Sequence, residues 1–181
     1  MDASLISSLR VALMNTLGGA LQNPSQIDTP RPLAASTSAP STGHNLTGGV
    51  IGDVTGIVSY TGSLVGTITL SMALDTALGL AHRMAGLPIT TETQPLDDAA
   101  MASIAESVGE LLAMVAMSSL FSSTAHDSAM ASCPTVIIGP GHRIACAPDT
   151  PTVQIRCATE LGELLLDVSV RPSPGSIPAA A

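Results

Sequence analysis

Two glutamates one helical turn apart are the residues of this sequence whose type and spacing could do chemistry. Glu106 and Glu110 lie in residues 101–120, MASIAESVGELLAMVAMSSL, so both carboxylates would share one face of a helix. Ala113 and Met117 continue that face at the same spacing. Two interpretations are open: the carboxylates keep an apolar helix soluble, or Glu110 points at a partner.

The opposite face of this segment predicts a buried stripe. Apolar residues recur at steps of three and four, the period of an α-helix, at Met101, Ile104, Val108, Leu111 and Val115. Asp97 and Asp98 precede the stripe and place carboxylates at the positive end of the helix. We therefore expect one long amphipathic helix that begins near these aspartates.

Composition argues against nucleic acid and anionic membrane surfaces as partners. The 181 residues carry a formal net charge of −8, and the basic residues are six dispersed arginines. A nucleic-acid-binding protein needs a basic stripe, usually with aromatic side chains for stacking. This chain has one Tyr, one Phe and no Trp.

Three further features of the sequence favour a cytoplasmic protein without membrane insertion. Residues 99–121 are almost long enough to span a bilayer, but Glu106 and Glu110 interrupt them, each costing about 2–3 kcal/mol at the bilayer centre. The start of the chain lacks the basic region of a signal peptide. Three cysteines without a C-x-x-C pair fit a reducing compartment. No spacing indicates a metal site or a bound cofactor.

Local patterns predict the elements that must hold the long helix. We expect a helix over 2–21, a Pro/Ser/Thr-rich mobile loop over 28–48, a hairpin of strands 50–60 and 64–70, and a helix over 71–86. A strand over 134–138 should end at a turn formed by Gly139-Pro140-Gly141. Strands over 152–158 and 164–170 and a disordered tail over 172–181 complete the chain.

This order predicts an α+β layered domain. Hairpins imply antiparallel pairing, so we expect a mainly antiparallel sheet packed against two or three helices. The long amphipathic helix is one of those helices. A doubly wound parallel fold is disfavoured.

Four segments in order resemble the CheX family of chemotaxis phosphatases, which is related to the CheC and FliY proteins. They are GDVTGIVSYTGSLVGTITLSM at 52–72, ESVGELLAMVA at 106–116, PTVIIGPGHRI at 134–144 and TVQIRCATELGELLLDVSV at 152–170. The resemblance implies a single CheX-like domain over residues 1–171, with the loop at 28–48 inside it.

Such proteins dephosphorylate the phospho-aspartate of the response regulator CheY. Their motif is a Glu followed three residues later by an Asn on an exposed helix, where the Glu docks on the regulator's active-site lysine and the Asn orients a water for in-line attack. Aligned with this motif, Glu110 is the docking carboxylate and Ala113 stands at the position of the Asn. A methyl group cannot position a water, so whether the chain is an enzyme is open.

The resemblance implies a CheY-like receiver domain as partner, with Glu106, Met114 and Met117 as further contact residues beside Glu110. It implies no cofactor beyond the Mg²⁺ that a receiver brings, and a homodimer through a sheet edge. The first hypothesis is a binding module with lost or reduced phosphatase activity. The alternatives are an active phosphatase that uses Glu106, Ser107 or Ser118 in place of the amide, and a structural or assembly domain.

Overall fold

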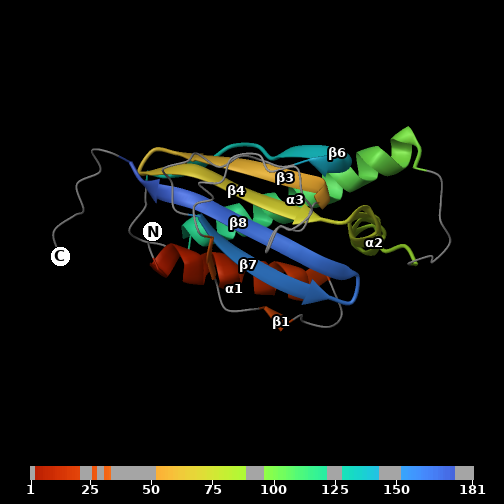
Figure 1. Cartoon of the computed structure of the whole chain (residues 1–181), viewed down its shortest axis with the longest axis horizontal. Helices are drawn as coiled ribbons and strands as arrows, with labels where there is room; N and C mark the ends of the chain where they lie inside the picture. The colour runs from red at the N-terminus through yellow and green to blue at the C-terminus, as the bar shows by residue number, and fades with distance from the viewer. Residues whose placement is uncertain are drawn as a thin grey trace, which may run out of the picture.

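The computed structural model describes residues 3–20, 26–27, 31–33, 52–88, 96–121, 128–142 and 152–173. They form an α+β fold in which three helices lie against one antiparallel sheet (Figure 1). The helices are α1 (Ala3–Ala20), α2 (Leu74–Met84) and α3 (Asp98–Phe121). The strands are β1 (Gln26–Ile27), β2 (Arg31–Leu33), β3 (Gly52–Thr61), β4 (Leu64–Met72), β5 (Met130–Ala131), β6 (Thr135–His142), β7 (Thr152–Thr159) and β8 (Gly162–Pro172).

The sheet has the strand order β1-β7-β8-β4-β3-β5. The short strand β2 also pairs with β7, and β6 also pairs with β3, so both ends of the sheet are made by two strands in succession. All these pairings are antiparallel among the described residues. The predicted α+β class and antiparallel sheet are confirmed.

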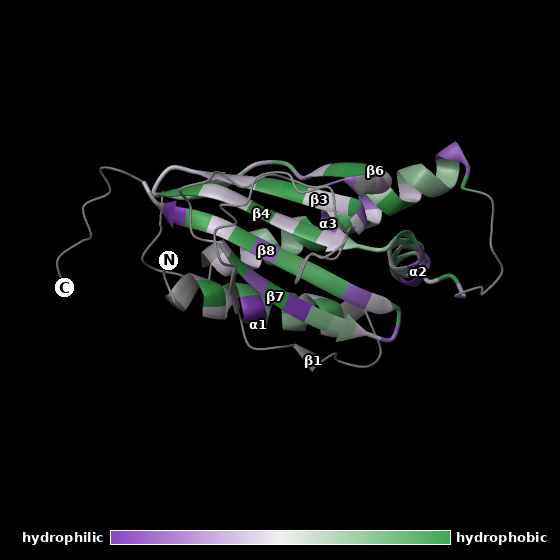
Figure 2. Cartoon of the chain, in the orientation of Figure 1, coloured by the Kyte–Doolittle hydropathy of each residue, from purple (hydrophilic) through white to green (hydrophobic). Residues whose placement is uncertain are grey.

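Alternation along the strands gives the sheet two different faces. One face carries apolar residues that are almost fully buried against the helices, among them Val54, Val58, Ile68, Leu70, Leu166 and Val168. Figure 2 shows hydrophobic residues running along β3, β4 and β8. The core therefore lies between the sheet and the three helices.

The second face of the sheet carries several short polar side chains that have little contact with solvent. Thr55, Thr69 and Ser169 alternate with the core residues and are 2%, 5% and 4% exposed. The Oγ1 atom of Thr55 lies 3.0 Å from the Oγ atom of Ser71 on the neighbouring strand. These two hydroxyls thus satisfy each other across neighbouring strands.

One predicted turn is wrong. Gly139-Pro140-Gly141 lies inside β6, where the register with β3 jumps from Val54 opposite Ile138 to Gly52 opposite His142. The three residues bulge opposite Asp53 instead of ending the strand. Proline lacks an N–H donor and is tolerated in bulges and edge strands, and β6 pairs only with β3 among the described residues.

Short strands were missed where the sequence has no periodicity. Residues 31–33 of the predicted mobile loop 28–48 form β2, paired with β7. The remainder of that loop lies outside the described residues. Two residues of the predicted disordered tail 172–181 are ordered: Pro172 ends β8, and the Ser173 backbone N–H donates to the Ser63 carbonyl oxygen at 2.9 Å. Residues 174–181 lie outside the described part.

Candidate functional site

Helix α3 has the two faces that its sequence predicts. Ile104, Val108, Leu111, Leu112 and Val115 are each 0% exposed and form its core-facing stripe. On the other face, both Glu106 and Glu110 are exposed. The same solvent-facing side contains the candidate contact residues Met114 and Met117, 38% and 42% exposed, whereas Ala113 is half-buried.

The start of α3 is fixed by a side-chain cap. The Ala100 backbone N–H donates to the Asp97 Oδ1 atom at 2.8 Å, and the Met101 N–H donates to the Asp97 carbonyl oxygen at 3.0 Å. An aspartate that accepts from the first turn satisfies an otherwise unpaired donor and suits the positive end of the helix. The predicted start near Asp97 and Asp98 is confirmed.

A close approach to the sheet fixes the middle of α3. A Cβ atom at Gly56 of β3 would lie 3.0 Å from Leu112 Cδ2 and 3.2 Å from Val108 Cγ1. A residue without a side chain is needed there because the helix rests almost directly on the strand. This contact turns Glu110 and Ala113 outward by fixing the rotation of α3.

The C-terminal half of α3 is held by a buried tyrosine. The Tyr60 hydroxyl donates to the Ala116 carbonyl oxygen at 3.1 Å and lies 3.1 Å from the Ser119 Oγ atom. Burial raises the pKa of Tyr60 to about 12, partly offset by the hydrogen bond with Ser119. The neutral hydroxyl therefore remains a donor at every physiological pH.

The exposed face of α3 has two unlike flanks. On one side Gly109 lies against β6, since a Cβ atom there would be 3.8 Å from Pro134 and from Val136. At 100° per residue, Ala113 follows Gly109 on this flank. On the other side lie the buried residues Ser107 and Leu111. Glu106, Glu110 and Met117 form the centre between them.

The carboxylates at this centre are not neutralised by the described part of the chain. Ion pairs there join Arg83 to Glu160 and Arg156 to Glu163, and neither includes Glu106 or Glu110. Helix α3 itself contains no Lys, Arg or His. The face can therefore attract a cationic group from outside the chain, while its methionines offer adaptable apolar contact.

The polar residues predicted as substitutes for a missing amide divide into two groups. Glu106 and Ser118 are exposed, whereas Ser107 is 8% exposed and belongs to the buried side of the helix. Sequence reasoning missed the flank formed by Pro134 and Val136, because that contact joins segments far apart in the chain. It also missed the support from Tyr60, for which the sequence offers only one weak signal, a lone aromatic in a β-branched strand.

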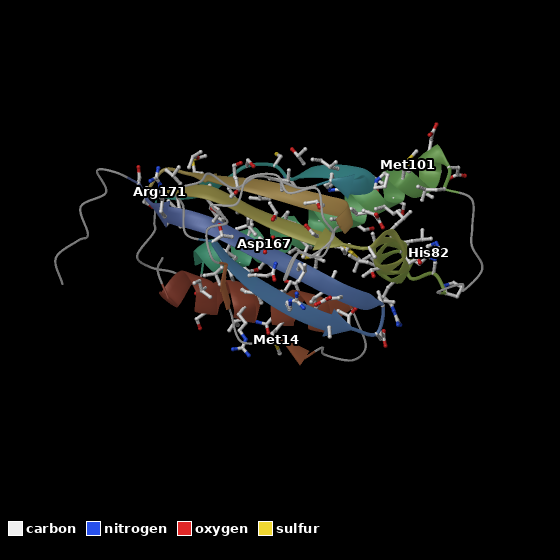
Figure 3. The ribbon with its side chains drawn as sticks, viewed as in Figure 1. Met14, His82, Met101, Asp167 and Arg171 are labelled. Carbon is white, nitrogen blue, oxygen red and sulfur yellow. The ribbon has the colours of Figure 1, made fainter. Side chains whose placement is uncertain are left out.

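A second polar cluster lies on the sheet face opposite the helices. Asp167 of β8 accepts a hydrogen bond from the Gln154 Nε2 atom at 2.9 Å, and burial raises the pKa of its carboxyl despite that bond. Figure 3 shows Asp167 about midway along β8, with α3 passing behind the sheet. The cluster is therefore separated from the Glu110 face by the sheet and by α3 itself, whose buried stripe packs on the sheet.

Length and composition alone would let α3 cross a membrane. Its residues Asp98–Ser119 pass that test with a mean hydropathy of 1.5. Within the domain the helix has a fully buried stripe and packs on β3, β6, α1 and α2. These contacts identify it as the core helix of the domain.

Comparison with known proteins gives a consistent family. The family model "Chemotaxis phosphatase CheX" matches residues 54–158, more than half of the chain. A sequence search of curated proteins returned no match.

Solved structures share the fold over almost the whole chain. The CheC-like superfamily protein from Shewanella sp. PV-4 is 18% identical, with a TM-score of 0.72 over 94% of this chain and 99% of the other. CheX from Desulfovibrio desulfuricans is 19% identical, with a TM-score of 0.69 over 93% and 99%. The CheX–CheY–BeF3–Mg²⁺ complex from Borrelia burgdorferi matches at 18% identity and a TM-score of 0.72 over 92% and 97%. With its family model and its fold in agreement, the chain belongs to the CheX family.

Proposed function

We propose that this protein binds the phosphorylated form of a CheY-type receiver domain through the Glu110 face of α3, with lost or reduced phosphatase activity. The observation that carries the proposal is the pair Glu110 and Ala113, one turn apart at an exposed helix face. A relative with the same fold was crystallised with CheY, BeF3 and Mg²⁺. That relative supports a receiver as the class of partner.

The chemistry of the two side chains supports docking by Glu110 but no catalytic role for Ala113. Glu110 is an exposed carboxylate that can pair with a lysine of the receiver. Ala113 offers a methyl where the family motif has an amide, so it can neither donate to nor accept from an attacking water. Loss of one positioning donor at a catalytic site typically lowers the rate about 10²-fold or more.

The proposed complex needs no cofactor of this chain's own. Mg²⁺ enters with the receiver, where it belongs to the phosphorylated site. Glu106, Met114 and Met117 enlarge the contact around Glu110. The cytoplasm is the proposed location, in keeping with a soluble chemotaxis signalling family.

An active phosphatase is the second candidate, favoured by the activity in the family's description. It requires another polar group to hold the water, and the candidates Glu106 and Ser118 are both exposed. Ser107 is a poor candidate because it is only 8% exposed.

We also propose a homodimer through the sheet edge formed by β5 and β6. Met130 and Ile137 on these strands are 68% and 39% exposed, and an edge strand offers unpaired backbone groups to a second copy. A purely structural or assembly role would use the same edge. Light scattering of the wild type and of Ile137→Lys tests it, and a wild-type mass of one chain at all concentrations would contradict it.

The main test is a titration with CheY-type receivers encoded in the same genome. Each receiver is measured with and without beryllofluoride, which mimics the phosphorylated aspartate. We expect tighter binding of the activated form and a loss of at least tenfold in Glu110→Ala. Asp75→Ala, an exposed acid on α2, is the matched control and should bind as the wild type does.

Two results would overturn the proposal. One is an absence of binding by every receiver in either state. The other is equal affinity of wild type and Glu110→Ala for an activated receiver. The decay of phosphorylated receiver, measured alongside, separates the two candidates: acceleration by the wild type identifies an active phosphatase.

A further inference from the structure

The two glutamates of α3 form a like-charged pair along the helix axis. Glu106 and Glu110 are four residues apart and both exposed, so their backbone positions lie about 6 Å apart along the axis. Like charges at this spacing repel and destabilise a helix. A single docking carboxylate would avoid that repulsion.

Nothing in the described part of the chain compensates the pair. No hydrogen bond or ion pair joins either carboxylate to another described residue, and α3 has no basic residue of its own. The chain as a whole carries a net charge of −8. A partner that binds this face can therefore supply a cation to each carboxylate.

The surroundings of the pair are suited to strengthening such contacts. Met114 and Met117 follow on the exposed side of α3, and the half-buried Gly109 and Ala113 form the flank toward β6. A partner that covers these apolar residues would remove water from the carboxylates. Ion pairs that lose water on binding interact more strongly than fully hydrated ones.

We infer that the face selects a receiver domain with two cationic side chains about one helical turn apart, one for each glutamate. The inference rests on the proposed function and deepens it by naming the charge pattern of the partner. Glu106 is then a specificity-determining residue. A receiver with a cation for Glu110 alone binds more weakly.

The test compares Glu106→Gln, Glu110→Gln and the double variant in binding to a beryllofluoride-activated receiver. Glutamine keeps the length and the helix propensity of glutamate while removing its charge. We expect Glu106→Gln to weaken binding about three- to tenfold at 50 mM salt. The difference from the wild type should shrink at 500 mM salt because the lost contact is electrostatic.

Asp75→Asn is the control, because it changes the net charge equally at a site on α2 and should leave the affinity within about twofold. Circular dichroism checks that each variant is folded. Equal affinity and equal salt dependence of Glu106→Gln and wild type, with weakened Glu110→Gln, would overturn this inference and leave the proposed function intact. No binding by the wild type would overturn both.

Discussion

The Tyr60 hydroxyl donates a hydrogen bond to the Ala116 carbonyl oxygen across 3.1 Å, joining β3 to the helix that presents Glu110. Both residues are buried, and the bond lies one turn beyond Ala113 along α3. The bond therefore connects the helix that carries the exposed face to the core of the domain.

Replacing Tyr60 by Phe should lower the free energy of unfolding by about 1 kcal/mol. The loss is modest because the Ser119 Oγ atom still donates to the Ala116 carbonyl oxygen at 2.7 Å, which leaves no acceptor unpaired. Denaturant unfolding measures the change. Ser119→Ala and the double variant complete a cycle, and additive losses would show that the two hydroxyls do not cooperate.

Alkaline pH should destabilise the protein through the same tyrosine. Its pKa is about 12 in the folded state and about 10 in the unfolded state, so its contribution is complete below pH 10 and is lost between pH 10 and 12. The contribution is on the order of 2–3 kcal/mol. Since the chain has one Tyr, absorbance at 295 nm follows this group alone. A midpoint near 10 in folded protein would contradict the prediction.

Asp167→Asn should raise stability at pH 7, by about 1 kcal/mol. Burial raises the pKa of Asp167, so the charged carboxylate at neutral pH is less stable in the folded state than in the unfolded chain. The asparagine Oδ1 atom can still accept from Gln154. Thermal unfolding at pH 7 and pH 3 checks the sign, because the advantage should disappear at pH 3, where the wild-type carboxyl is protonated.

Gly66→Ala should cost about 3 kcal/mol or prevent folding. Gly66 has φ +146°, and a Cβ atom there would lie 2.0 Å from the Ser169 carbonyl oxygen on β8. Gly139→Ala is the matched control on β6, since nothing lies within 4 Å of its Cβ position. Equal stability of the two variants would contradict the strand geometry around Gly66.

Ala113→Asn should create or increase phosphatase activity toward a receiver that the protein binds. The new amide would stand three residues after Glu110 at the exposed face, where it could position a water. We expect at least a tenfold faster decay of phosphorylated receiver than with the wild type. Ala113→Leu is the control for a change of size without polarity. An unchanged decay rate in the asparagine variant, with binding intact, would contradict the assignment of this position.

The sequence predicts those helices and strands that have a clear local pattern of residues. The helix at α3 follows from apolar periodicity and the Asp97 cap, and the β3–β4 and β7–β8 hairpins follow from glycines between β-branched runs. The position of Gly139-Pro140-Gly141 inside a strand does not follow from a local pattern, because it depends on a bulge opposite Asp53 at the sheet edge. Local breaker residues indicated a turn where tertiary pairing continues a strand.

In the candidate site, too, local features could be predicted from the sequence and long-range contacts could not. Exposure of Glu106 and Glu110 could be predicted from the stripe on the opposite side of α3. The flank at Pro134 and the support from Tyr60 could not, since both join residues remote in sequence. The roles of Glu110 and Ala113 in binding and catalysis stay predictions.

Substitutions at Ala113 and at the core positions near it have different consequences, because Ala113 is only half-buried. Leu112 and Val115, close to Ala113 on α3, are fully buried, so a substitution at either position changes the packing of the core. Ala113 itself keeps partial contact with solvent. A substitution at residue 113 can therefore change the surface that a partner meets while the packing of the core stays the same.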